Sequence, residues 1–370
     1  MDSHAECANR PDWLPCGNWL CAVLDLRSDR SVMRIRALDG WRGVAILMVL
    51  VTHSAQWALS GPPFEPLYLL GKHGVAIFFV LSGFLITRNL HSHPIDLKRF
   101  YKRRFFRLMP SAWAFLLFAC VLCAAYGESP LSIRFLGALL FFRNYVSDFP
   151  SLVSSLTGHF WSLSVEEQFY FFWPICLLLA GMRRGLWLAL AGFGISSFLV
   201  LRFWHFYAQG MNGHRTGAVV HALSCGCFLA LLIERDGARE WIDRYASYLL
   251  WGGAALFSAH VLFAPMVLIP PTESIAIAAM LASSIVRPIR AIEWAPLAFV
   301  GRISYSLYVW QAFFLMPHAG WLGIVLVIPA GILAHKFIES PGLALSHRPL
   351  VHSVDDDRAS GSEVSAIRVE

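Results

Sequence analysis

The stretch that decides the fold is WRGVAILMVLVTHSAQWAL, residues 41–59, an apolar run that holds one arginine and one histidine. Arg42 and His53 are separated by ten residues. At about 100° per residue, eleven helical steps make three turns plus roughly 20°, so both side chains share one helix face. The rise between them is about 16 Å, roughly half of a bilayer's hydrocarbon core. Ionisable groups inside a membrane span are costly, so this pair indicates a functional site.

The composition places the chain in a membrane. Of its 370 residues, 57% are hydrophobic and 15% are charged, whereas soluble domains carry about 25% charged residues. The net charge of +6 is no sign of nucleic-acid binding, because the basic residues gather in short loops beside apolar stretches, as in cytoplasmic loops of membrane proteins. The lipid bilayer is therefore the expected partner, and nucleic acid is not.

Apolar stretches predict an all-α polytopic bundle of about ten transmembrane helices. They cover residues 40–59, 69–89, 111–126, 164–181, 185–203, 217–233, 246–262, 273–287, 296–315 and 320–338. Lys and Arg are concentrated in alternate loops, so both termini are expected in the cytoplasm and the protein in the inner (plasma) membrane. We expect three segments: an N-terminal cytoplasmic lead at 1–33, with Met33 as an alternative start, a transmembrane domain at 34–341, and a disordered cytoplasmic tail at 342–370.

A basic segment precedes the third stretch and contains Arg99, Lys102, Arg103, Arg104 and Arg107. Ordinary cytoplasmic-loop bias accounts for part of this charge. Arg104 and Arg107 are three residues apart and share a helix face, which also suits bidentate binding of phosphate groups. A phosphate-rich ligand such as a nucleotide or coenzyme A fits this second interpretation.

A third polar block reads HFWSLSVEEQFY, residues 159–170. Its adjacent carboxylates, Glu166 and Glu167, point about 100° apart on a helix, so one is expected to face the bundle and the other to cap the helix start. The loop charges place this block in the outer half of the membrane, where His53 also points. Ser82 and Gly83 predict close helix packing. The Cys and His residues form no zinc pattern, so no metal is expected.

His53 allows more than one role. It is either a packed histidine or a functional one, and a neutral imidazole serves as a general base or carries an acyl group itself. The alternative for the whole chain is a transporter or flippase for a glycan or anion, which would use the same intramembrane His and Arg for substrate passage.

Taken together, these blocks resemble the type-3 membrane O-acyltransferase family over residues 34–341. The resemblance rests on six blocks in order: the Arg42–His53 pair, FFVLSGF at 78–84, the Arg104–Arg107 pair, WSLSVEEQFY at 161–170, SYSLY at 304–308, and Glu339 with Pro341. Many relatives have Trp-His after the SYSLY block, whereas here Gln311 follows Trp310. This departure puts the role of that position in question.

The resemblance implies an enzyme that moves an acyl group, acetyl above all, from cytoplasmic acyl-CoA to a hydroxyl of an extracytoplasmic glycan or lipid-linked saccharide. No cofactor is expected to stay bound. The resemblance implies His53 as the catalytic residue, and we expect Glu166 and Glu167 to assist it, either by orienting His53 or by binding sugar hydroxyls. Donor binding is expected at Arg42, Arg103, Arg104 and Arg107, and acceptor binding at His159, Trp161, Ser162, Tyr170 and Tyr305.

Overall fold

The computed structural model describes residues 35–58, 62–91, 95–129, 132–148, 150–207, 213–263, 270–315 and 320–346. Within these ranges the chain is helical and has no strand. The expected lead at 1–33 and residues 347–370 of the expected tail lie outside the described residues. The last described helix continues to Ser346, so the first residues assigned to the tail are helical.

The first half of the chain contains the helices that form most of the candidate site. They are α2 (Arg36–His53), the π-helical turn η1 (Ser54–Ala58), η2 (Pro62–Leu69), α3 (Leu70–His91), α4 (Leu97–Ala125), α5 (Ile133–Leu139), η3 (Arg143–Tyr145), α6 (Leu152–Thr157) and α7 (Phe160–Ala180).

The second half adds a further set of helices around this group. They are α8 (Met182–Arg202), α9 (Trp204–Tyr207), α10 (Thr216–Ile233), α11 (Ala238–Arg244), α12 (Ala246–Phe263), α13 (Pro270–Val286), α14 (Ala295–Arg302), α15 (Ser304–Phe314), α16 (Gly320–Ala334), the π-helical turn η5 (His335–Glu339) and α17 (Ser340–Ser346).

Six helical segments of the described chain are long and apolar enough to cross a membrane. They are Leu67–His91, Leu97–Ala125, Met182–Arg202, Thr216–Ile233, Ala246–Phe263 and Trp321–Ser346. The other predicted spans also coincide with helices, but these do not have the combination of length and hydropathy that the six share. Helix α2 carries Arg36, Asp39 and Arg42, and the stretch expected at 296–315 is divided at Ile303 into α14 and α15. The chain is a multi-pass helical membrane protein.

Helix α4 differs most from the sequence prediction. The span expected at 111–126 is the second half of a 29-residue helix. The helix begins early because the Asp96 side chain caps it, accepting a hydrogen bond from the Arg99 backbone N at 3.0 Å, and such a cap satisfies an otherwise free N–H. The basic segment is therefore helical, and its arginines point to different sides of the helix: Arg104 and Arg107 are half-buried, whereas Arg99 and Arg103 are exposed.

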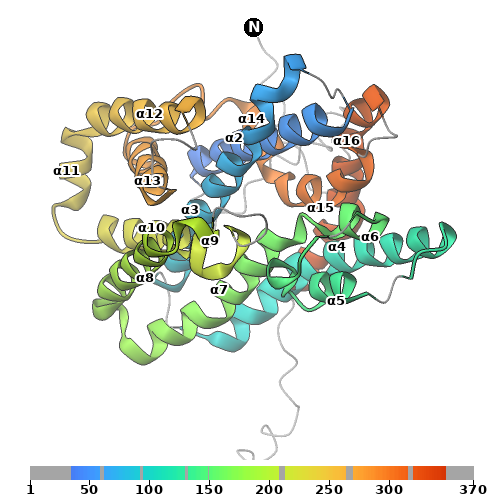
Figure 1. The fold of residues 1–370 in the computed structure, drawn as a ribbon. Helices are drawn as coiled ribbons and strands as arrows, with labels where there is room; N and C mark the ends of the chain where they lie inside the picture. Colours follow the sequence, from blue (N-terminus) through green and yellow to red (C-terminus); the bar gives the residue numbers. More distant parts are fainter. Residues whose placement is uncertain are drawn as a thin grey trace, which may run out of the picture.

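Close helix packing fixes the centre of the fold, where α3 lies against α10 and α2 (Figure 1). A Cβ added at Gly83 would collide with the backbone of Leu223, and one added at Gly226 would collide with the backbone of Val80. Such small residues allow helices to approach closely in lipid, where apolar burial gives little drive for association. The packing predicted from Ser82 and Gly83 is confirmed for Gly83.

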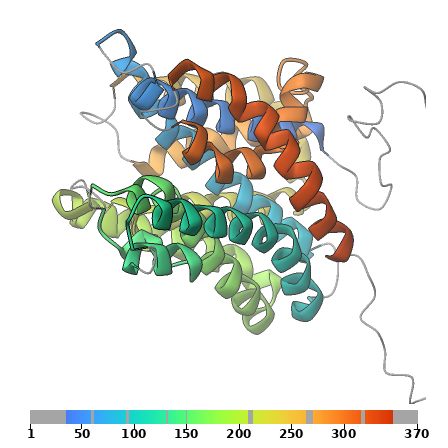
Figure 2. The same cartoon turned by 90° about the vertical axis from the view of Figure 1, so that its right-hand side faces the viewer.

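Two further contacts position the site. Seen from the side in Figure 2, the C-terminal red helices descend toward α4, and η5 and α17 pack directly on it. Helix α7 ends at Gly181, whose φ of +78° is a backbone conformation that glycine adopts readily. Each π-helical turn lies next to a buried or half-buried polar residue: η1 begins directly after His53, and η5 ends at Glu339. Single π turns occur frequently at functional sites.

Candidate active site

Two helices carry matching polar stripes. On α2 the stripe runs from Arg42 to His53, and on α7 it runs from His159, which immediately precedes the helix, to Tyr170. Each covers eleven steps, or about 16 Å. The stripes run in opposite directions, because His53 is within electrostatic range of His159 while Arg42 is within range of Glu166. The two stripes and the side chains between them form one polar track with a histidine end and an arginine end.

The histidine end is formed by His53, Gln311 and His159. The His53 Nδ1 atom lies 3.1 Å from the Gln311 Oε1 atom, so the imidazole donates from Nδ1 and its Nε2 carries the free lone pair. Gln311 is only 1% exposed. The position at which this chain departs from many relatives is therefore the direct partner of His53.

Helix α7 continues the track from this end. His159 Nε2 donates to the Val309 carbonyl oxygen at 3.1 Å, while its Nδ1 has no hydrogen-bond partner among the described residues. One turn further on, Ser162 Oγ and the Tyr308 hydroxyl are hydrogen-bonded at 2.6 Å, and Tyr308 also donates to the His159 carbonyl oxygen at 3.0 Å. These contacts join α7 to α15 in the middle of the track.

The arginine end contains three guanidinium groups, on Arg42, Arg104 and Arg107, which are close enough to repel one another. Arg104 stacks over the Tyr170 ring at 4.0 Å from its centroid. Within the described ranges, no salt bridge connects any of the three to a carboxylate. Three like charges held together without direct counter-ions favour an anionic ligand.

The carboxylates lie at this end of the track. Glu166 accepts hydrogen bonds from Ser82 Oγ and from the Tyr170 hydroxyl, both at 3.1 Å, and Arg104 and Arg42 are within electrostatic range. Glu167 is within range of Arg104. The expectation that this pair lies near His53 is wrong, because α4 begins early and its Arg104 lies beside α7, at the other end of the track.

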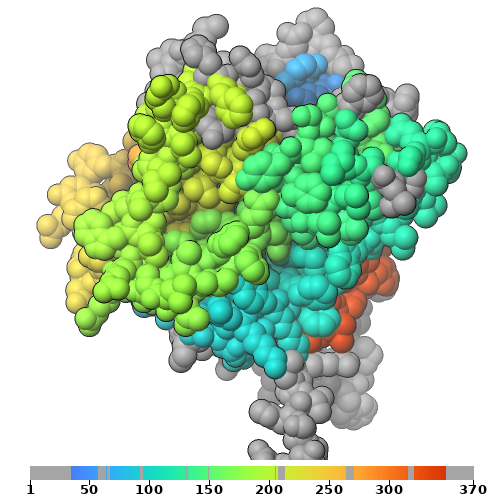
Figure 3. Space-filling view, turned by 60° about the horizontal axis from the view of Figure 1, so that its bottom comes forward, coloured from blue at the N-terminus to red at the C-terminus, as the bar shows by residue number. Residues whose placement is uncertain are grey.

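A cavity of about 410 Å³ opens beside the arginine end. Its lining comes from α4 and α7 and comprises Tyr101, Lys102, Arg104, Phe105, Met109, Glu167, Tyr170 and Phe171. Figure 3 shows the face on which α4, in cyan, adjoins α7 and α8, in green. The cavity therefore joins the surface of the molecule to the guanidinium group of Arg104 and to the carboxylate of Glu167.

Several predicted residues have positions other than those expected. Arg103 is exposed and does not line this cavity. The Tyr305 hydroxyl donates to the Leu108 carbonyl oxygen at 2.6 Å, near Arg107 and Glu339. Tyr170 and Tyr305, both expected to bind the acceptor, therefore lie at the arginine end.

Trp161 forms a separate aromatic surface near the start of α7. Its ring stacks on His214 with centroids 4.0 Å apart and an interplanar angle of 11°, and Phe79 packs against it edge-on. Burial lowers the pKa of His214 to about 4, since desolvation disfavours the imidazolium. The stack is thus an uncharged aromatic platform at neutral pH.

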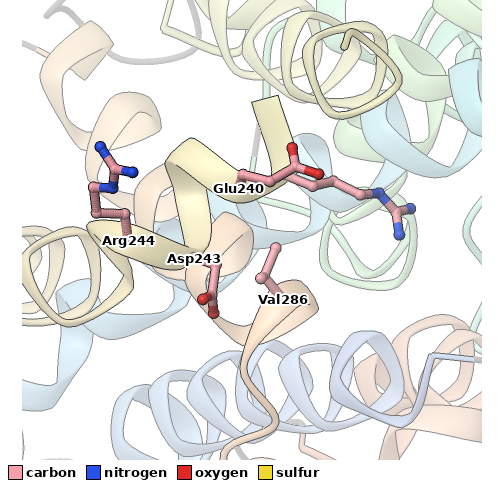
Figure 4. A pocket seen from close by; sticks show the side chains of 5 residues that line it. Glu240, Asp243, Arg244 and Val286 are labelled. Atoms are coloured by element: carbon pink, nitrogen blue, oxygen red, sulfur yellow. The ribbon is translucent and has the colours of Figure 1, made fainter. Parts of the chain in front are cut away.

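A second hollow lies far from this track in sequence and is not assigned to it. It is lined by Arg239, Glu240, Asp243 and Arg244 of α11 and by Val286 of α13 (Figure 4). Asp243 accepts a hydrogen bond from Arg287 Nε at 2.6 Å. This lowers the pKa of the Asp243 carboxyl, and both groups are exposed, as in a surface ion pair.

Sequence reasoning did not assign Gln311 or Tyr308 to the site, and it treated Ser82 mainly as a packing residue. The signal that could have assigned them to the site was the presence of polar side chains in otherwise apolar helices. Gln311 and Tyr308 are three residues apart on α15 and so share a face, while Ser82 lies inside the predicted second span, at 69–89.

Comparisons with known proteins agree with the geometry. A family model described as an acyltransferase domain matches residues 35–335. A putative O-acetyltransferase of Staphylococcus aureus strain COL is 26% identical over 84% of this chain and 58% of its own length. The O-acetyltransferase OatA of S. aureus strain NCTC 8325 is 28% identical over 74% of this chain and 49% of its own length.

A shorter match is to the peptidoglycan O-acetyltransferase OatA of Listeria monocytogenes, which is 32% identical over 39% of this chain and 24% of its own length. The chain spans about half the length of the curated relatives it matches. No solved structure matches the chain. Because the family model covers most of the residues and includes both ends of the polar track, the chain belongs to the acyltransferase-domain family.

Proposed function

We propose that this protein is an integral membrane O-acyltransferase. It transfers an acetyl group from cytoplasmic acetyl-CoA to a hydroxyl of an extracytoplasmic glycan or lipid-linked saccharide, in the cell's inner membrane and with both termini in the cytoplasm. The observation that carries the proposal is the polar track. It joins three arginines to a histidine, and among the described residues no carboxylate forms a salt bridge with these arginines and no group bonds the histidine Nε2.

The donor binds at the arginine end. Arg42, Arg104 and Arg107 contact its phosphates, since guanidinium groups bind phosphate oxygens in pairs. The cavity between α4 and α7 admits the nucleotide portion, and the stack of Arg104 on Tyr170 supports its entry. From there the pantetheine arm follows the track for about 16 Å to reach His53.

The acceptor approaches the histidine end. His53 Nε2 removes the proton of the acceptor hydroxyl, which then attacks the thioester carbonyl carbon. The Trp161–His214 platform offers a flat apolar surface for a sugar ring. The position of Glu166 and Glu167 supports a role in ordering the arginines around the donor, in place of a direct role on His53.

The rival function is a transporter or flippase that uses the same intramembrane charges without chemistry. The two are distinguished by acetyl-CoA, which the enzyme consumes and the transporter does not need. The family model and the names of the relatives favour the enzyme.

The test uses radiolabelled acetyl-CoA added to membranes from cells that contain the protein. The expected result is alkali-labile label in the glycan fraction with the wild type, and loss of that label with His53→Ala. His53→Ala is expected to keep acetyl-CoA affinity, because it leaves the arginine end intact. Transfer by His53→Ala at the wild-type rate would refute the assignment of the base, and failure of the wild type to bind acetyl-CoA would favour the transporter.

A further inference from the structure

The cavity between α4 and α7 is lined by a regular stripe of side chains on each helix. On α4, the lining residues Tyr101, Phe105 and Met109 recur at every fourth position. On α7, Glu167 and Phe171 are also four positions apart. Residues with this spacing lie on the same face of a helix. The cavity therefore lies between one face of α4 and one face of α7, and both faces present defined side chains to it.

Aromatic rings form the larger part of this lining. The Tyr101 and Phe171 rings have centroids 6.1 Å apart and are tilted by 33°. The Tyr101 hydroxyl donates to the Phe171 carbonyl oxygen at 2.7 Å, a hydrogen bond that connects α4 to α7 and holds the Tyr101 ring in place. The side chains of Phe105 and Phe171 are exposed. A fixed and accessible aromatic surface inside a cavity suits a flat ring system, because aromatic faces stack on one another.

Charged groups line the same cavity beside the aromatic rings. Lys102 and Arg104 supply positive charge. The carboxylate of Glu166 accepts two hydrogen bonds from side chains, whereas that of its neighbour Glu167 accepts none within the described part of the chain and has Arg104 within electrostatic range. An ionised carboxylate only accepts hydrogen bonds. Glu167 is therefore available to an N–H or O–H donor of a ligand.

These groups define the ligand by three requirements. It needs a flat ring to stack on the aromatic surface, an N–H or O–H group to meet the carboxylate, and negative charge to meet the two cations. A phospholipid headgroup offers charge but no ring, and the pantetheine arm of coenzyme A offers N–H groups but no ring. The adenosine bisphosphate portion of coenzyme A meets all three, because adenine is flat, carries an exocyclic amino group and is joined to phosphates.

We propose that this cavity recognises the adenine base of the donor: the base stacks on the Tyr101–Phe171 pair, and its exocyclic amino group donates to Glu167. The inference rests on the acyl transfer proposed above and deepens it by naming the residues that select the donor. Lys102 and Arg104 lie beside the base and contact the phosphates. A thioester on a protein-bound phosphopantetheine lacks adenine and so loses these contacts, which makes acyl-CoA the preferred donor class.

The first test measures the contribution of the aromatic stack. Unlabelled coenzyme A and phosphopantetheine, which lacks the adenosine portion, compete with radiolabelled coenzyme A for the purified protein in nanodiscs. Phe171→Ala should raise the Kd for coenzyme A about 5- to 150-fold, the range that follows from the loss of one base stack. It should change the Kd for phosphopantetheine less than threefold, whereas a variant that merely disturbs the packing of α4 on α7 would weaken both ligands.

The matched control is Phe172→Ala. Phe172 is the next residue on α7 and is also exposed, but it does not line the cavity. The control removes a ring of the same size and should change the Kd for coenzyme A less than threefold. Equal losses in Phe171→Ala and Phe172→Ala would overturn the proposal, because they would assign the effect to exposed aromatic rings in general.

The second test isolates the hydrogen bond to Glu167. Its probe is an analogue of coenzyme A in which hydrogen replaces the exocyclic amino group of the base. The wild type should bind coenzyme A about 10- to 150-fold more tightly than the analogue, as expected for a hydrogen bond to a charged group. In Glu167→Ala this ratio should fall below threefold. The ratio is the readout, because removing a carboxylate near the phosphates changes the affinity for both ligands equally.

The outcomes separate this inference from the function on which it rests. If the wild type binds coenzyme A no more than threefold better than phosphopantetheine, the adenine site is refuted while the transfer reaction stands. A ratio in Glu167→Ala equal to that of the wild type also refutes it, as does a loss of both ligands in Phe171→Ala. If the wild type binds neither coenzyme A nor phosphopantetheine, the proposed function fails instead.

Discussion

Arg104 provides the most direct test of the donor site. Its guanidinium lies 4.0 Å above the Tyr170 ring, lines the cavity between α4 and α7, and forms no salt bridge with a carboxylate of the described chain. Its charge is therefore available to a ligand. A charge-assisted hydrogen bond is worth about 1.5–3 kcal/mol.

Replacing Arg104 by Ala removes that contact, so the Kd for coenzyme A should rise about 10- to 150-fold. Arg104→Lys keeps a positive charge but loses the planar fork and its stack on Tyr170, so its affinity should fall between those of the wild type and Arg104→Ala. Binding is measured by calorimetry on the purified protein in nanodiscs. Coenzyme A without an acyl group is the probe, so the readout does not depend on turnover.

The control is Arg184→Ala, which removes an exposed positive charge from α8, outside the cavity lining. It should change the Kd less than twofold at moderate salt, because an exposed charge is largely screened. Coenzyme A affinity of Arg104→Ala within threefold of the wild type would refute the donor site, as would equal losses in Arg104→Ala and Arg184→Ala.

Three further outcomes are expected. Gly226→Ala should lower the free energy of unfolding by about 1–3 kcal/mol, because the new Cβ atom would collide with the backbone of Val80. Gly194→Ala is the control and should be near neutral, since no atom lies within 4 Å of its Cβ position. Thermal unfolding in detergent measures both. The pKa of His214 is about 4 in the native state and about 6.5 when unfolded, so the unfolded chain binds the proton first as the pH falls. Lowering the pH from 7 to 5 should therefore reduce the free energy of unfolding by about 2 kcal/mol. His214→Phe should lack this contribution. Trp161→Ala should reduce acetyl transfer to glycan by about 3- to 10-fold with no change in coenzyme A affinity, and a parallel loss of both would count against an acceptor platform.

The sequence predicted where the helices lie better than how they face one another. Hydropathy located α8, α10 and α12 within a few residues, because a membrane span is a local property of about 20 side chains. The break at Ile303 was not predicted, although Gly301 and Arg302 directly precede it, because the stretch as a whole is apolar enough for one span. The spacing of Arg42 and His53 gave one side of the track, because helical periodicity is also local.

The opposite side of the track could not be predicted in the same way. The depth of Glu166 depends on which helix packs beside α7, and the prediction treated the basic segment before residue 111 as a loop. Once Asp96 caps α4, that segment becomes helix and Arg104 reaches Tyr170. Likewise, a glutamine in an apolar helix does not reveal its partner, so the contact between Gln311 and His53 required the tertiary structure.

The middle of the polar track has a consequence for the energised membrane. An enzyme with charged groups near both faces must not become a leak for protons and ions. Between the arginine end and the histidine end lies the buried hydroxyl pair of Ser162 and Tyr308, with the Phe78 ring packed edge-on against Tyr308. Neither hydroxyl carries a charge near neutral pH, so this part of the track offers no fixed charge to a passing ion, and we expect cells that overproduce the protein to keep their membrane potential.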